Sequence, residues 1–390
     1  MNYSMKCWSE RHQLLSGSTL EMIIFTLLFP PICILGIVGN TLNLLVLLSS
    51  EMRSRANSLL ACLAFCDIVF LLLMIPHSLA NFNVFALNYS FRWYYLSAKI
   101  HLITLANWSS AVAIWLVVAV CVERVMGIRQ PFHTRGHWSR YCTAAIVFTI
   151  VLIAGMLTFY NHFSHICVVK EFCNRTQVMA KCFDVTLDAW PGNRTNITPL
   201  IHRNYVKWSI IANAVFVVIV PIILLTALNG ALIVFVKRRS FLIYQNLTDS
   251  SRKNVRREQR ASLFRRNTDQ VSQQKTEHRI AITVSAIVTC FTITQGPSAI
   301  VLSINSFSSK RTASGHPEIG LNWYHMQTVT SFLVIIGKTL NFILFCLSSS
   351  NFRWRLMGIL RNKLKGFQKR RSSNISGMLL TLAPGSARRL

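Results

Sequence analysis

The sequence has few charged residues, and acidic residues are the scarcest of them. Lys, Arg, Asp and Glu together make up 14% of the 390 residues, and only 13 residues are Asp or Glu. Soluble domains carry charge on about a quarter of their residues. Because hydrophobic residues reach 52%, the composition excludes an ordinary soluble domain and indicates an integral membrane protein.

Residue patterns that carry catalysis or bind cofactors are also missing. The sequence has no Ser/His/Asp arrangement, no His/Cys cluster at metal-ligand spacing and no phosphate-binding glycine loop. The glycine in Thr294-Gln295-Gly296-Pro297 is explained more simply by a helix kink at the proline. We therefore expect a protein that is not an enzyme and that has no cofactor and no metal site.

Internal repeats and a chain of intramembrane acids are missing as well. Many transporters have two similar halves, and transport paths are commonly lined by acids. Here Asp67 is the only acid well inside an apolar stretch, and the stretches do not divide into similar halves. A transporter or channel is therefore the disfavoured alternative.

Seven apolar stretches are long enough to cross a bilayer as helices, since its hydrocarbon core needs about 20 residues. The sequence therefore predicts an all-α membrane protein with a seven-transmembrane helix bundle at 22–347. The first stretch is too long and too weakly basic at its front for a cleaved signal, so we count it as a span. The predicted spans are 22–48, 57–80, 97–127, 140–160, 205–238, 277–305 and 321–347.

The basic residues predict the orientation of the bundle. Lys and Arg cluster at 237–239, at 252–266 and in the C-terminal tail, all on one side of the membrane if the seven spans are correct. Because cytoplasmic segments carry the Lys/Arg excess, residues 1–21 are predicted to be extracellular and the protein to lie in the plasma membrane. The formal net charge of +28 then needs no nucleic-acid partner. We expect disorder in the basic third cytoplasmic loop, 239–276, and in the tail, 362–390.

Sequons and cysteines agree with this orientation. Four cysteines, Cys7, Cys167, Cys173 and Cys182, lie in segments assigned outside, where two disulfides can form. The sequence does not choose among their three possible pairings. Glycosylation is predicted at five Asn-X-Ser/Thr sites in the same segments: Asn2, Asn88, Asn174, Asn193 and Asn196.

Polar residues and prolines inside the predicted spans form an ordered pattern, with a match in most of the spans. Together they resemble the fingerprint of rhodopsin-like G-protein-coupled receptors over about residues 22–360. The matching residues are Gly39-Asn40, Leu63-Ala64-X-X-Asp67, Glu123-Arg124, Pro221, Phe291 with Pro297, and Asn341. The resemblance implies a receptor that binds an extracellular ligand and activates a heterotrimeric G protein when the sixth span moves outward.

The cytoplasmic ends of spans three and six carry the implied activation residues. Glu123-Arg124-Val125 resembles the Asp/Glu-Arg-Tyr motif of the family, in which the acid and Glu277 hold the arginine in the inactive state. Pro131-Phe132 resembles the segment whose bulky residue docks into the G protein. In span six, the resemblance makes Phe291, Gln295 and Pro297 the switch region, and in span seven it assigns coupling roles to Asn341 and Phe345.

A short amphipathic helix is predicted at 350–361, after the last span. Phe352, Leu356, Ile359 and Leu360 share one face, and Arg353, Arg355 and Arg361 are interleaved. Such a helix lies along the membrane surface and contacts lipids. It resembles the eighth helix of the receptor family.

Five positions depart from the family pattern. The usual Asn-Pro-X-X-Tyr reads Asn341-Phe342-Ile343-Leu344-Phe345, so the proline and the tyrosine are lost. Asn229 replaces the tyrosine of inner span five, and Gln295 replaces the usual tryptophan of span six. Lys99 stands where the disulfide cysteine of span three is expected, so the link from span three to the second extracellular loop is missing or replaced.

Lys338 is a further departure, in span seven. A lysine in hydrocarbon must find a carboxylate, lose its proton or reach water. In the family, the residue at Asp67 is a ligand of a sodium site near span seven. We expect Asn40, Asp67 and Lys338 to form a polar network in the core. Our hypothesis is that the Lys338 ammonium replaces that sodium ion beside Asp67; the alternative is a neutral or water-facing lysine.

The ligand is indicated only in outline. Ala106 replaces the aspartate of aminergic receptors, and Ile335 replaces the retinal lysine of opsins. Neutral hydrogen-bonding groups with a long, Cys-bearing second extracellular loop favour a peptide, and the seventh span resembles FMRFamide-like neuropeptide receptors of invertebrates. A chemosensory receptor for a small molecule is the alternative. The predicted pocket residues are His77, Asn107, Ser110, Asn213, Ser298, Asn305, Gln327 and Ser331.

Overall fold

The computed structural model describes residues 7–50, 54–129, 140–190, 194–252, 285–301, 304, 321–348 and 352–361. Several predicted features lie outside the described residues. These are most of the third cytoplasmic loop, the tail 362–390, Pro131, Phe132, Glu277, Asn305, Asn2 and Asn193. The helix that contains Phe345 is described, but the side chain of Phe345 is not.

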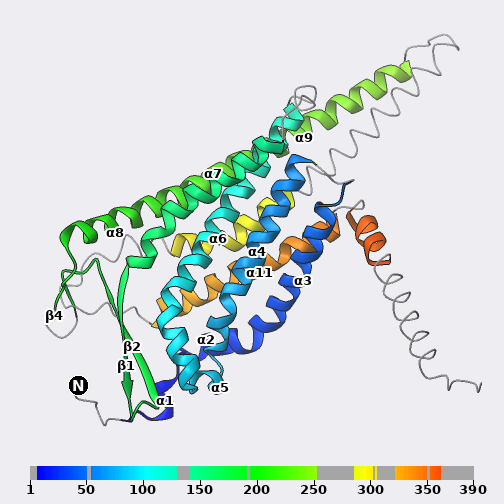
Figure 1. Cartoon of the computed structure of the whole chain (residues 1–390). Coiled ribbons are helices and arrows are strands. Elements are labelled where there is room, and N and C mark those ends of the chain that lie inside the picture. Colours follow the sequence, from blue (N-terminus) through cyan, green and yellow to red (C-terminus); the bar gives the residue numbers. More distant parts are fainter. Residues whose placement is uncertain are drawn as a thin grey trace, which may run out of the picture.

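Long apolar helices run side by side through the molecule (Figure 1). Six of the described helices have the length and composition to cross a membrane, and the shorter apolar helix Ser285–Val301 lies within the sixth predicted stretch. The prediction of a seven-helix membrane bundle is confirmed. The labelled elements are α2 (Thr19–Ile23), η1 (Ile24–Leu28), α3 (Phe29–Leu47), α4 (Arg55–Leu79), α6 (Tyr89–Arg129), α7 (Arg140–Thr158), η4 (Phe159–Phe163), α8 (Leu200–Asn213), η5 (Ala214–Ile219), α9 (Val220–Arg252) and α11 (Leu321–Ser348).

Local sequence explains where two of these helices begin and bend. Ser54 precedes α4, and its hydroxyl accepts a hydrogen bond from Asn57 N at 3.2 Å, the usual role of an N-cap serine. The π-helical turn η5 ends just before Pro221. Proline has no N–H and its ring collides with the carbonyl four residues earlier, so a wider turn at this point lets the helix continue past it.

Two helices are longer than the membrane requires. With 41 residues, α6 is about 60 Å long, roughly twice the hydrocarbon thickness. It begins at Tyr89, eight residues before the predicted span at 97. At the other end, α9 continues to Arg252, and residues 239–252, which the sequence analysis assigns to a disordered loop, are helical.

The predicted second extracellular loop contains a β-hairpin, which could not be predicted from the sequence. β1 (His165–Phe172) pairs antiparallel with β2 (Gln177–Asp184), and Cys167 lies opposite Cys182. A disulfide joins these two cysteines, and a second joins Cys7 to Cys173 at the hairpin tip. The two disulfides predicted among the four outer cysteines are therefore present, and their pairing is settled. The short strands β3 (Ala189–Trp190) and β4 (Arg194–Thr195) pair with each other.

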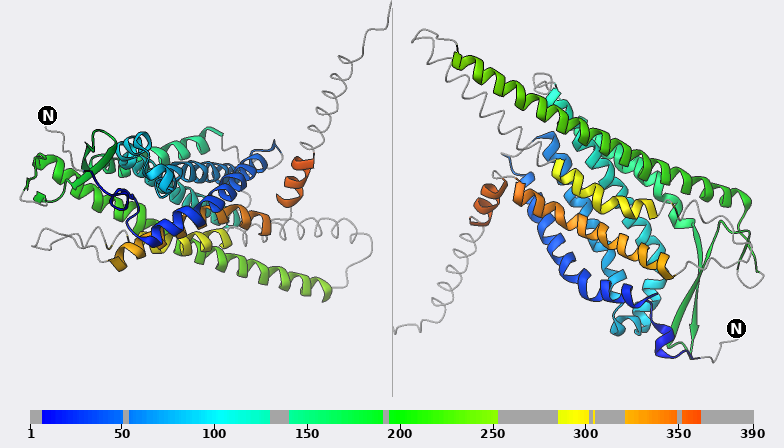
Figure 2. Two further views of the ribbon diagram at one scale, coloured as in Figure 1. Left: turned by 90° about the horizontal axis from the view of Figure 1, so that it is seen from below. Right: turned by 180° about the vertical axis from the view of Figure 1, so that it is seen from behind.

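The two ends of the bundle carry different structures (Figure 2). The hairpin, α1 (Glu10–Gln13) and α5 (Asn83–Ala86) lie at one end, and the helix at 352–361 lies at the opposite end. In that last helix, Phe352 is 1% exposed and belongs to the same apolar core cluster as Leu116 and Val117 of α6. Leu356 and Ile359 pack against this cluster, whereas Leu360 is exposed.

Candidate functional site

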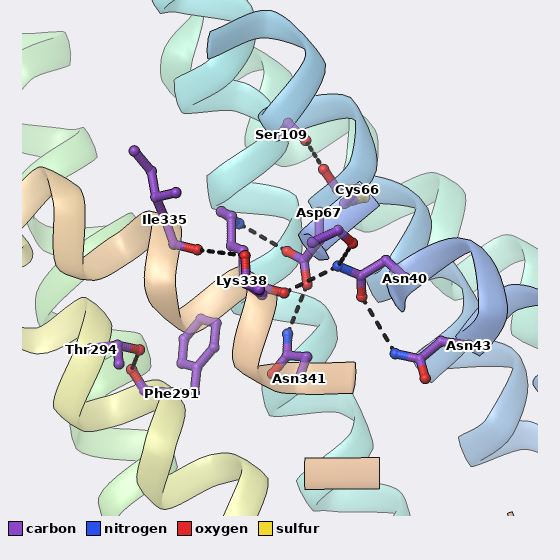
Figure 3. A network of polar contacts seen from close by, with 12 residues as sticks. Asn40, Asn43, Cys66, Asp67, Ser109, Phe291, Thr294, Ile335, Lys338 and Asn341 are labelled. Atoms are coloured by element: carbon purple, nitrogen blue, oxygen red, sulfur yellow. Dashed lines mark hydrogen bonds and ion pairs between the residues drawn. The ribbon is translucent and has the colours of Figure 1, made fainter. Parts of the chain in front are cut away.

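A buried ion pair lies at the centre of the bundle (Figure 3). Lys338 Nζ of α11 lies 3.0 Å from Asp67 Oδ1 of α4, and both side chains are 1% exposed. The ammonium also lies 4.6 Å from the centroid of the Phe70 ring. The ammonium therefore lies between a carboxylate and the face of an aromatic ring, two groups that attract a cation.

Amide side chains complete the polar network around this pair (Figure 3). Asn341 Nδ2 donates to the second oxygen of Asp67 at 2.7 Å, so both carboxylate oxygens are used. Asn40 Nδ2 donates to the Lys338 carbonyl at 3.1 Å and ties α3 to α11. Gly39 permits this approach, because a Cβ there would lie 2.7 Å from the Phe342 ring. The three residues predicted as a core polar network, Asn40, Asp67 and Lys338, thus meet in one place.

The contacts at the C-terminal end of α6 differ from the expectation. Glu123 Oε1 lies 3.3 Å from Arg55 Nη1 of α4, so its ion pair is with Arg55 and not with Arg124. Neighbouring residues on a helix point in different directions, which leaves Glu123 free to reach α4. Arg124 Nε is buried and has no hydrogen-bond partner among the described residues. Glu277, its other predicted partner, lies outside those residues.

A second polar contact joins α9 to the first turns of the helix Ser285–Val301. Asn229 Nδ2 donates to Thr289 Oγ1 at 3.1 Å, and Ser285 Oγ donates to Asn229 Oδ1 at 2.8 Å. One amide therefore uses its donor and its acceptor on two successive turns of the neighbouring helix. In this chain Asn229 stands where the family has a tyrosine, and its amide connects α9 to the helix Ser285–Val301.

At the outer end of the bundle, Glu21 joins four segments. Its carboxylate accepts hydrogen bonds from Gly17 N at 2.6 Å and from the Tyr324 hydroxyl of α11. His77 Nε2 of α4 lies 3.6 Å from Glu21 Oε1, and His77 Nδ1 is hydrogen-bonded to the Tyr95 hydroxyl of α6 at 2.8 Å. Glu21 is 7% exposed, so a carboxylate is buried at the mouth of the bundle together with its partners.

Arg92 connects α6 to the extracellular segments. Its guanidinium is buried, and Nε donates to the Val178 carbonyl of β2 at 2.8 Å. Nη1 donates to the Ala86 carbonyl at 2.6 Å and to the Gln13 carbonyl of the N-terminal segment. These bonds join span three to the second extracellular loop. In the family that connection is made by a disulfide cysteine, and this chain has Lys99 at the corresponding position.

The predicted pocket residues do not form one hydrogen-bonded cluster. Among the described residues, none of these side chains bonds to another: His77 takes part in the Glu21 cluster, and Asn213 Nδ2 donates to the Tyr160 hydroxyl at 3.4 Å. Asn107 and Gln327 are exposed, and the three serines, Ser110, Ser298 and Ser331, are half-buried.

Two buried amides near the outer half of the bundle have unused hydrogen-bonding atoms. Gln295 Nε2, at the predicted switch of the sixth span, has no partner among the described residues, and the side chain is 8% exposed. Asn81 donates from Nδ2 to the His77 carbonyl at 2.8 Å, while its Oδ1 has no partner in the part of the chain that the structure describes. Leaving such groups unpaired costs about 1–3 kcal/mol each, so each is a candidate contact for a ligand or a water molecule.

Three residues with structural roles, Glu21, Arg55 and Arg92, are not indicated by the sequence. Glu21 stands directly before the first apolar stretch, and Arg55 directly before the second. Charges at such positions are common membrane-flanking residues, so nothing in their spacing distinguishes them. Arg92 lies in a segment that the sequence placed in a loop, and only the outward extension of α6 shows that it is buried.

The structure describes three of the predicted glycosylation sites. Asn88 and Asn174 are exposed. Asn196 Nδ2 donates to the Val185 carbonyl at 2.9 Å and to the Leu187 carbonyl at 2.6 Å. A glycosylated amide nitrogen keeps a single hydrogen, so a glycan at Asn196 requires the loss of one of these bonds.

Comparisons with known proteins agree with this architecture. The profile of a family described as serpentine-type seven-transmembrane G-protein-coupled chemoreceptor Srw matches residues 28–363. The Caenorhabditis elegans protein described as G-protein coupled receptor F59B2.13 is 37% identical over 374 residues, which cover 95% of this chain and 82% of that protein. Sex peptide receptor-related protein 2 of C. elegans is 23% identical over 361 residues (86% of this chain, 70% of that protein). The FMRFamide receptor of Drosophila melanogaster is 26% identical over 165 residues (40% and 29%).

Proposed function

The chain belongs to the serpentine-type seven-transmembrane G-protein-coupled receptor family Srw, and from this premise we propose that its ligand is an extracellular peptide. Two of the similar proteins carry peptide names, sex peptide receptor-related protein 2 and the FMRFamide receptor. The hairpin of β1 and β2 lies across one end of the bundle, which supports a ligand large enough to contact both the helices and the hairpin.

The observation that carries this proposal is the unpaired donor of Gln295 among the described residues. A buried amide nitrogen without an acceptor is stabilised by a ligand carbonyl, and peptides present a carbonyl at every residue and at an amidated C-terminus. Lys99, Arg175 and Lys181 add positive charge at the same end. That charge disfavours a strongly cationic peptide.

A peptide library applied to cells that express the receptor with a promiscuous G-protein reporter tests the ligand class. We expect one peptide family to activate, and Gln295→Leu to reduce its potency by about tenfold, since a lost hydrogen bond to a buried amide costs about 1–2 kcal/mol. Thr292→Ala is the matched control, because Thr292 Oγ1 bonds to the Val288 carbonyl of its own helix. Activation by small molecules alone would contradict the proposal.

We further propose that signalling passes to a heterotrimeric G protein at the cytoplasmic end, with Arg124 as the central contact. Arg124→Ala is expected to abolish signalling while surface expression is preserved. Glu277→Ala is expected to raise basal signalling, because losing an ion pair of about 1 kcal/mol shifts a two-state ratio about fivefold. A reporter assay normalised to surface receptor measures the signalling of both variants. Unchanged signalling in both would contradict the assignment of Glu277 as the residue that holds Arg124 in the inactive state.

The contact between α9 and the sixth helix makes a separate prediction. Asn229→Ala removes both bonds to Ser285 and Thr289, so the sixth helix moves outward at lower cost and basal signalling is expected to rise a few-fold. Thr226→Ala on the same helix is the control, because its hydroxyl bonds to the Ile222 carbonyl of its own helix. Equal basal signalling in the two variants would contradict this role.

A plasma-membrane location with the N-terminus outside is part of the same proposal. The hairpin, with its disulfides, lies at the end opposite the helix at 352–361, and disulfides persist in oxidising compartments. An epitope tag at the N-terminus should be detected on intact cells and a tag at the C-terminus only after permeabilisation.

A small-molecule chemosensory ligand is the second candidate, favoured by the family description as a chemoreceptor. It predicts that substitutions in the hairpin of β1 and β2 leave the potency of the ligand unchanged, because a small ligand would bind within the helices alone. The peptide proposal predicts a loss of potency in the same variants.

A further inference from the structure

Two histidines from different elements meet at the outer surface of the bundle. His101 belongs to α6 and His162 to η4, the short turn that follows α7, and their Nδ1 atoms lie 2.8 Å apart. The ring centroids are 5.0 Å apart with an angle of 37° between the planes. We propose that this pair is a binding site for a divalent transition-metal ion, with Zn²⁺ as its first candidate and water completing the coordination.

The separation of the two nitrogens suits a shared metal ion. Zn–N bonds are about 2.0–2.1 Å long, so two imidazole nitrogens on one ion lie about 3.0–3.4 Å apart for angles from square to tetrahedral. The rings need to part by only a few tenths of an ångström. The hydrogen bond between the two Nδ1 atoms needs a proton on one of them, and a metal ion bound by both nitrogens would displace that proton.

The surroundings leave the ion accessible and do not repel it strongly. His101 is exposed and His162 is half-buried, so water can reach the open coordination positions. Lys99 is two residues before His101, and its ammonium lies over the Tyr95 ring, 5.9 Å from the centroid. Because residues two apart on a helix do not face the same side, this charge points away from the histidine pair.

Aromatic rings hold the histidine of η4 in position. Phe159 and Phe163 flank His162 with edge contacts at 5.7 and 6.4 Å between centroids. Restricting a ligand's ring in this way lowers the entropy lost on metal binding. No group of three or more His, Cys, Asp or Glu side chains suited to a metal ion occurs in the described segments, so two protein ligands and a modest affinity are expected.

The position of the site determines which elements a bound ion would connect. His101 lies 23 residues before Arg124 in the sequence, about 35 Å along the helix, which places it near the outer membrane boundary. His162 is three residues before β1 begins at His165. A bound ion would therefore fasten α6 to the base of the hairpin.

The test uses the full-length receptor purified in lipid nanodiscs, titrated with ZnCl₂ by calorimetry. We expect one site in the micromolar range, and a loss of about tenfold or more in affinity for His101→Gln and for His162→Gln, since even outer-shell changes cost 10- to 100-fold. His202→Gln is the matched control. Its ring also contacts Phe163 but lies outside the hydrogen bond between the two histidines, and its affinity should equal that of the wild type.

A measurement on the wild type alone guards against misfolded variants. Zn²⁺ should protect His101 and His162 from diethylpyrocarbonate, read by mass spectrometry, and should leave His12 and His202 modified as before. Protection of neither histidine, or unchanged affinity in the double variant, would overturn the proposal. Neither readout depends on the ligand or on G-protein coupling.

Discussion

Lys338→Met is expected to lower the melting temperature of the purified receptor by about 5 °C, because it leaves the Asp67 carboxylate buried without its cation, at a cost of about 3–5 kcal/mol. Asp67 and Lys338 are both 1% exposed, so water cannot take over the lost contact. Thermal unfolding in detergent measures this effect without any knowledge of the ligand.

The double variant Asp67→Asn, Lys338→Met should recover most of the lost stability. It removes both charges together, and replacing a buried pair by neutral groups of similar volume is often nearly neutral. The amide introduced in place of the Asp67 carboxylate still accepts a hydrogen bond from Asn341, which in the wild type donates to Asp67 at 2.7 Å. If the double variant were as unstable as the sum of the two single variants, the pair would not be the unit that we describe.

Sodium provides the sharper form of the same prediction. In the wild type the Lys338 ammonium lies 3.0 Å from the carboxylate, where a sodium ion would otherwise bind, so we expect equal stability in sodium chloride and in N-methylglucamine chloride. Lys338→Met opens this place and should be stabilised by sodium alone. A wild type that is itself stabilised by sodium would contradict the hypothesis that the Lys338 ammonium replaces the sodium ion beside Asp67.

Much of the transmembrane architecture could be predicted from the sequence because the bilayer imposes it. Each span must be apolar for about 20 residues, so seven stretches and the few polar residues within them are visible in one dimension. Asp67 and Lys338 illustrate this, since each costs too much in hydrocarbon to lack a partner. Their pairing follows from scarcity of acids more than from any motif.

The extracellular structure could not be predicted in the same way. Outside the membrane a charged residue needs no partner, so Arg92 looks like an ordinary loop arginine, and the four outer cysteines allow three pairings. The hairpin strands are only eight residues each, and alternation is weak in their burial. The link between α6 and the hairpin depends on Arg92, whose contacts with other residues span from 6 to 87 positions of the sequence. No local sequence pattern indicates such contacts.

Arg92→Ala is expected to produce the largest loss of surface expression among variants of the extracellular side. It leaves the carbonyls of Gln13, Ala86 and Val178 without their donor. Each buried unpaired group costs about 1–3 kcal/mol, and three together are comparable with the stability of a whole domain. Flow cytometry with an N-terminal tag, compared with total receptor by immunoblot, measures the loss.

Arg92→Lys separates charge from geometry. Lysine keeps the positive charge but lacks the planar fork that lets one side chain donate in several directions, so it should recover only a part of the expression. Arg175→Ala is the control, because Arg175 is 64% exposed and its pair with Glu171 lies on the surface, where such pairs contribute about 0–1 kcal/mol. Full expression of Arg92→Lys would mean that the planar geometry of the arginine is not needed for this link. Because Cys7–Cys173 fastens the N-terminal segment to the hairpin but not the hairpin to α6, the disulfide cannot compensate for the loss of Arg92.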